Sequence, residues 1–292
     1  MILHHALRQG AGVGALVRVG LSGLGTRPSA VPSTPGAPVI RTVSPRAHAL
    51  LQDYARWSGG SSDTVPPHLF SQWCFPALSR TLMDLPWPLV RVLNQGCRLT
   101  VHGPLPAGEP LQVRAWLEGV DEQPHKVRLH QVVHTGPASQ PDALVADVYA
   151  VVPTGRREGG GRERPRVPGG ATPVARVAAE RGDGLRFACL TGDFNPIHWL
   201  PPYARMAGFD GPILHGFGLL ARTWEALVAG RLAGRDRIAT MDVRFVRPTA
   251  LPSDLGVYLG PGDQGVHDLA VGPAPGGPAN LLGTVRFGAL DV

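Results

Sequence analysis

The residues whose types and spacing best suit chemistry lie between Thr191 and His198, where the chain reads Thr-Gly-Asp-Phe-Asn-Pro-Ile-His. Asp193 and His198 both carry groups that donate and accept protons in enzymes. Pro196 lies between them and interrupts a regular helix, so this segment is expected to form a turn on which both side chains converge. A carboxyl group and an imidazole placed in this way form an acid/base pair that can add water to a substrate or remove it.

Two neighbours of this pair could shape the turn. The amide of Asn195 could hold either group by a hydrogen bond, and Gly192 permits a backbone conformation closed to larger residues. A Gly-Asp-x-Asn segment could equally cap a helix, and Asp-x-Asn also begins calcium-binding loops. The calcium interpretation fails because no acidic ligand or suitably placed glycine follows. We therefore expect no metal at this site.

A second segment is expected to supply a main-chain donor. From Pro212 the chain reads Pro-Ile-Leu-His-Gly-Phe-Gly and continues into a helical pattern, so Gly216 lies near a helix N-terminus. Free N–H groups at such an end favour negative charge, which makes the Gly216 amide a candidate donor to a developing oxyanion. In the alternative interpretation, Gly216 and Gly218 only allow tight helix packing. His215 could point into the site or fix the helix entry by hydrogen bonding.

The elements that must position these residues occur twice in the same order. In the first half, a helical pattern over residues 47–57 and an apolar segment over 68–85 precede four strand-like runs, at 94–102, 110–120, 126–135 and 143–152. In the second half, a helical pattern over 174–189, the turn and a helix over 216–229 precede four more, at 238–246, 253–259, 266–271 and 281–287. The sequence thus predicts two similar α+β halves. Only the second carries the acid/base residues, which predicts one active site per chain.

Composition sets the expected boundaries between these parts. Residues 1–42 form an N-terminal arm and loose linker, and residues 153–173 form a charged linker rich in glycine and proline. The two halves then occupy residues 43–152 and 174–292.

The charge of the chain is basic without indicating nucleic acid. The formal net charge is +6 and the pI is about 9.9, but the positive residues are scattered arginines and Lys126 is the only lysine. Cys74, Cys97 and Cys189 lack the spacing of a disulfide framework or a zinc site and fit a reducing compartment such as the cytoplasm. No apolar run reaches the roughly 20 residues that a membrane span needs.

The N-terminus contains arginines and no acidic residue before Asp53. Residues 1–25 could be an organellar targeting segment, but an arm that packs on the first half is the favoured interpretation. Most other histidines show no ligand spacing with Cys or Glu and are predicted to be ordinary surface or strand residues; these are His4, His5, His102, His125, His130, His134 and His267.

The motif residues resemble the MaoC-like dehydratases and R-specific enoyl-CoA hydratases. The signature of that family is an aromatic-containing helix end, then Gly-Asp-x-Asn-Pro-aliphatic-His, then a His-Gly-hydrophobic helix start. This chain has Phe187, the segment 192–198 and the segment 215–217 in that order. The resemblance is closer over 174–292 than over 43–152, and the layout is similar to the double-hotdog (3R)-hydroxyacyl-thioester dehydratases.

The resemblance implies a double hotdog fold, in which each of two repeats wraps a long helix in a curved antiparallel sheet. It implies that Asp193 and His198 are the catalytic pair, that the Gly216 amide is the oxyanion donor and that Asn195 is an orienting residue. The implied reaction is the hydration of a trans-2-enoyl thioester of CoA or acyl-carrier protein, or its reverse, without a cofactor. The Trp199 that follows His198 departs from the family pattern and leaves the substrate shape open.

Two other functions remain open from the sequence. A thioesterase on the same fold would need a carboxylate that attacks the carbonyl or activates water there. A non-catalytic subunit that binds acyl chains or supports another enzyme would be expected to lack the Asp/His pair. Two halves in one chain can cover each other's sheet edges, so a monomer or a homodimer is expected.

Overall fold

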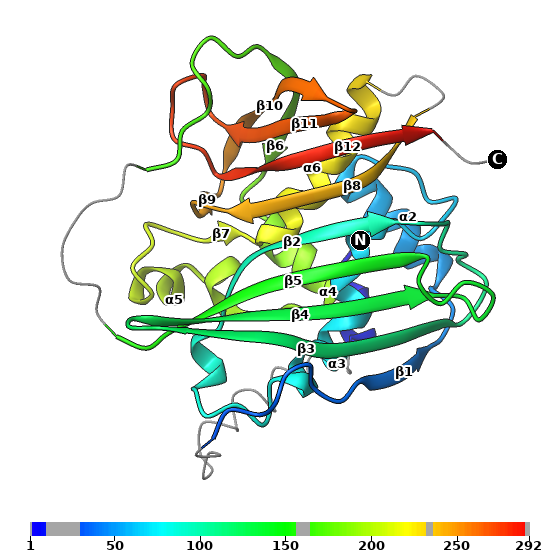
Figure 1. Ribbon diagram of the computed structural model, residues 1–292. Coiled ribbons are helices and arrows are strands. Elements are labelled where there is room, and N and C mark those ends of the chain that lie inside the picture. The colour runs from blue at the N-terminus through cyan, green and yellow to red at the C-terminus, as the bar shows by residue number, and fades with distance from the viewer. Residues whose placement is uncertain (1, 10–29, 156–163, 232–235, 290–292) are drawn as a thin grey trace.

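The computed structural model describes residues 2–9, 30–155, 164–231 and 236–289, and the statements below refer to these residues. Ten strands form one continuous antiparallel sheet, and the main helices pack on a single face of it (Figure 1). Most strands alternate buried and exposed residues, as β3 does, because one face of the sheet meets the core and the other meets solvent.

The strands of the first half are β1 (Val39–Val43), β2 (Leu93–Val101), β3 (Leu111–Gln123), β4 (Lys126–Gly136) and β5 (Leu144–Pro153). Those of the second half are β6 (Pro173–Ala179), β8 (Asp236–Phe245), β10 (Ser253–Asp263), β11 (Val266–Gly272) and β12 (Leu281–Ala289). A separate two-stranded ribbon joins β7 (Ile213–Leu214) to β9 (Thr249–Ala250).

The strand order shows that the two halves repeat one topology. Across the sheet the order is β1-β3-β4-β5-β2 and then β8-β12-β11-β10-β6, so the first strand of each half lies at an outer edge. The halves meet where β2 pairs with β8, with Cys97 opposite Val243 and Leu99 opposite Met241. This is the α+β double hotdog that the sequence predicts.

The helices of the first half are α2 (His48–Ser58) and α3 (Ser71–Thr81), with the short 3-10 helices η1 (Ile2–Arg8), η2 (Pro67–Leu69) and η3 (Leu89–Arg91). Those of the second half are α4 (Asp183–Thr191), α5 (Pro201–Met206) and α6 (Gly216–Arg231), with the 3-10 helix η4 (Pro196–His198). Helices α3 and α6 contribute buried apolar residues to the shared core. Near their N-termini the rings of Phe70 and Phe217 meet edge to face, with centroids 5.0 Å apart.

Three segments differ from the sequence-based expectation. Residues 174–179, predicted as the start of a helix, form strand β6, because the edge of β10 takes up their main-chain groups. Strand β1 pairs with β3 although it begins at Val39, inside the segment assigned to the arm and linker. Within the segment assigned to the second linker, Val167 is buried beside Tyr258.

The described part of the N-terminal arm is held against the two halves. Its residues 2–8 form the 3-10 helix η1, and residues 10–29 lie outside the described part of the chain. His5 and Gln9 are buried, and Ile2 packs against the core.

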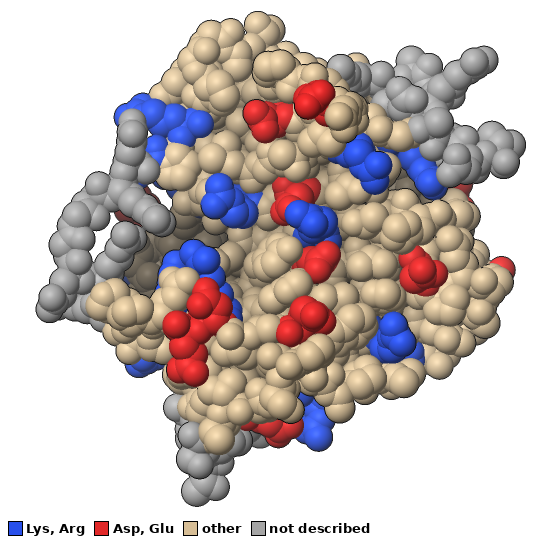
Figure 2. Space-filling view, in the orientation of Figure 1, with Lys and Arg blue, Asp and Glu red and all other residues tan. Residues whose placement is uncertain are grey.

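The charged side chains on the outer face of the sheet are of both signs. Figure 2 shows acidic and basic residues intermixed there, and Arg98 on β2 is paired with Asp242 on β8 across the junction of the halves, with 2.6 Å between Nη2 and Oδ2. Among the described residues on this face, the basic groups form no continuous stripe of the kind that tracks a nucleic-acid backbone. None of the described helices is long and apolar enough to cross a membrane.

Candidate active site

The turn that carries Asp193 and His198 lies between the end of helix α4 and the 3-10 helix η4. Helix α4 ends at Thr191, and Gly192 follows with φ of 88°, a left-handed conformation that costs glycine little, so that its N–H reaches Ala188 O at 2.7 Å. Asn195 and Pro196 then begin η4, which ends at His198. The segment between α4 and η4 is therefore a turn, as the position of Pro196 in the sequence led us to expect.

His198 is fixed in both position and tautomer. Its ring is buried, and Nδ1 lies 2.8 Å from Ile213 O, a carbonyl that can only accept, so Nδ1 donates the hydrogen. In the neutral ring, Nε2 is then the nitrogen with a free lone pair. Gly184 of α4 lies directly against the main chain of His198, where a Cβ atom would overlap the carbonyl oxygen.

His215 is the third member of the site. Its ring stacks on that of His198 with centroids 3.5 Å apart, and its Nε2 donates to Asp193 O at 2.9 Å. The same nitrogen is 3.9 Å from Oδ2 of Asp193. Of the two roles that the sequence left open for His215, the structure shows both: the ring fixes the turn and faces the acid/base pair.

Burial keeps both imidazoles neutral. Desolvation lowers the pKa of His198 below its usual value, although the nearby Asp193 and the bond to Ile213 O oppose this shift. Desolvation and the proximity of His198 lower the pKa of His215 still further. At neutral pH His198 can therefore accept a proton.

Asn195 acts on the turn through local bonds. Its side-chain Oδ1 accepts from Ile197 N at 3.3 Å, and its main-chain N–H donates to Asp193 Oδ1 at 3.3 Å. The side-chain amide, which could have held either Asp193 or His198, thus shapes η4, and the main-chain N–H of Asn195 contacts the Asp193 carboxyl group. Trp199 also supports the turn, because its Nε1 donates to Phe194 O at 3.2 Å.

Gly216 is the first residue of α6 and follows directly on His215. The first N–H groups of a helix have no acceptor within it. A Cβ atom at this position would lie 2.6 Å from the ring of Phe245, so the packing interpretation of this glycine also has a physical basis. The two interpretations are compatible, since the same close packing fixes where the N–H lies.

The first half contains a counterpart of His215 that sequence reasoning missed. Gly59 follows α2 with φ of 93°, as Gly192 follows α4, and this match places Tyr54 where the second half has Phe187. His68 stacks on Tyr54, as His215 packs on Phe187. The signal lay in the sequence: His68-Leu69-Phe70 leads into α3, and His215-Gly216-Phe217 leads into and begins α6.

This counterpart lacks the chemistry of the second half. Leu69, fully buried, stands where the second half has Gly216, and both ring nitrogens of His68 are occupied. Tyr54 Oη is 2.9 Å from Nδ1, and Glu225 Oε1, from α6 of the other half, is 2.7 Å from Nε2. The group joins the two halves and leaves no acceptor nitrogen for a substrate.

Asp193, His198 and His215 each offer a metal-ligand atom within 4.8 Å of the others. The other nitrogen of His215, Nδ1, is buried and has no hydrogen-bond partner among the described residues, because Phe187 has no hydroxyl where Tyr54 has one. One nitrogen of each ring is already bonded to a main-chain carbonyl. The arrangement therefore suits proton transfer by His198 with support from His215.

The class of this site is given by a family model, the MaoC-like domain, which matches residues 168–268. The match includes Asp193, His198 and Gly216, so the second half contains a MaoC-like domain.

Particular proteins of known sequence or structure are also similar. The 3-hydroxyacyl-thioester dehydratase X of Mycobacterium tuberculosis is 26% identical over 209 residues, which cover 70% of this chain and 72% of the relative. The crystal structure of HtdX of Mycobacterium tuberculosis has a TM-score of 0.70 at 23% identity and covers 86% of this chain and 99% of its own. A conserved Mycobacterium tuberculosis protein described as a double hotdog has a TM-score of 0.53 at 15% identity, over 88% of this chain and 96% of its own. These similarities confirm the predicted fold.

Proposed function

We propose that this protein is a hydro-lyase that interconverts trans-2-enoyl and (3R)-3-hydroxyacyl thioesters in fatty-acid or related lipid metabolism. One observation carries the proposal: within a MaoC-like domain, Asp193, a neutral His198 and the start of α6 lie together. The similarity to a 3-hydroxyacyl-thioester dehydratase supports the same reaction.

In the hydration direction, a water molecule lies between the carboxyl group of Asp193 and Nε2 of His198. Nε2 takes a proton from this water while the oxygen adds to C3 of the enoyl group. The Asp193/His198 pair returns one proton to C2, so the reaction adds one water and leaves the pair unchanged. Asp193 can reach both water and substrate because its side chain is 32% exposed.

The charge that develops on the thioester oxygen is the second requirement of this reaction. The Gly216 N–H donates to that oxygen, supported by the positive end of α6. His215 keeps Asp193 in place through its main-chain oxygen. Dehydration follows the same steps in reverse.

The test is hydration of crotonyl-CoA and of longer enoyl-CoAs by purified variants. Asp193→Asn and His198→Ala are each expected to lower kcat by about 10²–10⁴-fold, the usual contribution of a general acid or base. Asp121→Asn on β3 and His48→Ala on α2, which change exposed residues of the first half, are matched controls and should retain activity.

Near-normal hydration by both site variants would refute the assignment. Release of free thiol from acyl-CoA would instead indicate the thioesterase alternative. A wild-type protein that binds acyl thioesters without changing them would indicate a non-catalytic subunit.

The proposal extends to features beyond the reaction. The substrate is carried on CoA or acyl-carrier protein, and kcat/KM across C4 to C16 enoyl-CoAs would define the chain length. The half that contains β1 to β5 is the degenerate hotdog, and the half that contains β6 to β12 is the catalytic one. A cytoplasmic location is supported by the three cysteines, which are all buried and unpaired. The protein is a monomer or a homodimer.

A further inference from the structure

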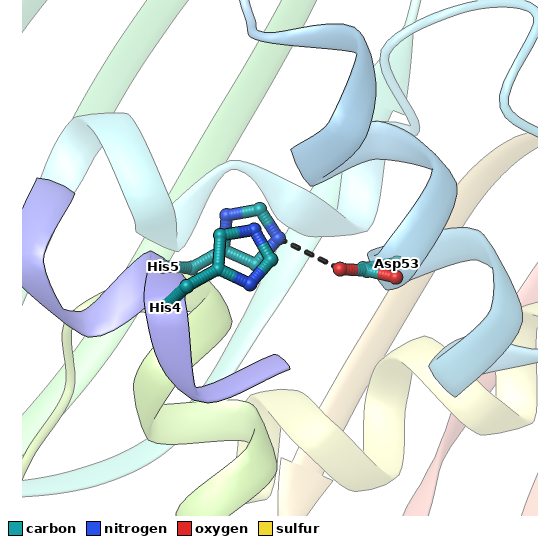
Figure 3. Close-up of side chains that lie close together, drawn as sticks. All are labelled: His4, His5 and Asp53. Atoms are coloured by element: carbon teal, nitrogen blue, oxygen red, sulfur yellow. Dashed lines mark hydrogen bonds and ion pairs between the residues drawn. The ribbon is translucent and has the colours of Figure 1, made fainter. Parts of the chain in front are cut away.

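A second group of metal-binding side chains lies away from the acid/base site. His4 and His5 belong to η1, and Asp53 belongs to α2, so the group joins two segments that are far apart in the sequence (Figure 3). Nε2 of His5 is 2.9 Å from Oδ2 of Asp53. The rings of His4 and His5 have centroids 3.9 Å apart, and one ligand atom from each of the three residues lies within 4.8 Å of the others.

We propose that His4, His5 and Asp53 bind a divalent transition-metal ion, with Zn²⁺ as the best-suited one. Two imidazoles and one carboxylate are ligands that Zn²⁺ commonly takes. Neither residue type nor local spacing revealed this group, because the carboxylate comes from another element.

The distances suit a tetrahedral ion after a small adjustment. Bonds of roughly 2.0–2.2 Å place neighbouring ligand atoms about 3.3 Å apart. The atoms of His5 and Asp53 are 2.9 Å apart and need to separate only slightly as the ion replaces the hydrogen between them. The ligand atom of His4 lies within 4.8 Å of those of His5 and Asp53 and would have to come closer to them on binding.

Burial gives this group one fixed side and one open side. His5 and Asp53 are 1% and 8% exposed, so the protein holds them in place. His4 is exposed, which leaves a fourth coordination position for water. The structure thus provides three protein ligands with access from solvent.

Arg56 is the neighbour that opposes a cation. Its Nη1 bonds to Oδ1 of Asp53 at 2.7 Å, which leaves Oδ2 for the metal. The Arg56 side chain is 72% exposed, so it can move away from an incoming ion. Its positive charge should nevertheless weaken binding, and its removal should strengthen it.

An ion at this place would fasten the N-terminal segment to both halves. At the end of η1, Gln9 Nε2 donates to the carbonyl oxygens of Cys189 and Leu190 at 3.2 and 3.0 Å. These carbonyls belong to the last turn of α4, directly before the turn that carries Asp193. Metal binding would therefore stabilise the segment that closes the end of this helix.

The test is a Zn²⁺ titration of the full chain, measured by competition with a chromophoric chelator and by the shift in Tm. Wild type should bind one equivalent with a rise in Tm. His4→Ala, which removes an exposed ligand, and Asp53→Asn should each weaken binding by at least about tenfold, the least that loss of a ligand should cost. Arg56→Gln should bind more tightly than wild type.

Two controls make the result specific. His48→Ala removes another exposed histidine, on α2 itself, and should bind Zn²⁺ as wild type does. His198→Ala removes a ligand atom from the other possible metal group and should also leave the affinity unchanged. The proposal is overturned if wild type binds no Zn²⁺ above the level of His4→Ala, which would leave the His5–Asp53 contact as a structural anchor. It is equally overturned if His198→Ala, and not His4→Ala, loses the bound ion.

Discussion

His198 and His215 face each other in the interior, and this contact has a cost when either ring gains a proton. Burial opposes a charge on each ring, and a charge on His198 further opposes one on His215. The native protein therefore binds fewer protons at these two residues than the unfolded chain does.

The sign of the resulting pH dependence follows directly. Between the lowered native pKa values and the unfolded value of about 6.5, the unfolded chain holds more protons, so stability falls as the pH falls through this window. Urea unfolding at about pH 7.5 and about pH 5.5 should show a loss of about 1 kcal/mol for each group whose native pKa lies well below the window.

His215→Asn should show a smaller difference between the two pH values than wild type. His48→Ala, which changes an exposed ring, should show the same difference as wild type. Equal pH dependence in His215→Asn and wild type would contradict the role assigned to burial.

Residue types and spacing could predict that Asp193 and His198 lie close together, because both belong to one short turn. They could not predict the stacking of His215 on His198, which depends on the ribbon of β7 and β9 that leads into α6. The contact of His5 with Asp53 was equally beyond reach, since local spacing says nothing about a partner on another element.

At the scale of elements, the approach of α4 to η4 decides where His198 lies. Gly184→Ala would place a methyl group on the main-chain oxygen of His198 and force the two elements apart. Hydration activity should fall by at least about tenfold, because a shift of about 1 Å at a catalytic group can cost about 10²-fold. The fold itself should persist, and steady-state kinetics together with circular dichroism would show both results.

Gly182→Ala is the matched control in the same turn. A Cβ atom at Gly182 would meet only the guanidinium of Arg186, at 3.7 Å or more, so this variant should keep near-normal activity. Equal loss in the two variants would show that the effect arises from the helix start and not from contact with His198.

Periodicity predicted most elements correctly because their apolar residues alternate or recur along a single face. It failed over residues 174–179, where small and branched residues suit a helix and a strand equally well. The pairing of this segment with β10 decides the outcome, and that pairing is tertiary information. Strand β1 was missed for the same reason, because its extended conformation depends on pairing with β3.

At the scale of the molecule, the halves share one core and one sheet. Trp57 of the first half donates from Nε1 to the buried Asp183 of the second, at 3.1 Å. Residues 164–292 expressed alone would expose the pairing edge of β8 and remove one of the hydrogen-bond donors to this buried carboxylate.

We expect this fragment to aggregate or to lack a cooperative thermal transition, whereas the full chain should unfold as one unit. Differential scanning calorimetry of both proteins checks this expectation. A fragment that unfolds cooperatively on its own would show that the second half is stable without the first.

The covalent link between the halves also has a consequence for symmetry. In a dimer of two identical single repeats, paired as β2 and β8 pair here, equivalent positions would carry the same residue. Such a dimer could not have Tyr54 in one repeat and Phe187 at the equivalent position of the other, or Leu69 in one and Gly216 in the other. Fusion into one chain allows equivalent positions to differ. The first repeat can therefore hold the two halves together while the second keeps the acid/base residues. The stoichiometry follows: a tight-binding substrate analogue should saturate the protein at one equivalent per pair of repeats, whereas a dimer of equal repeats would bind two.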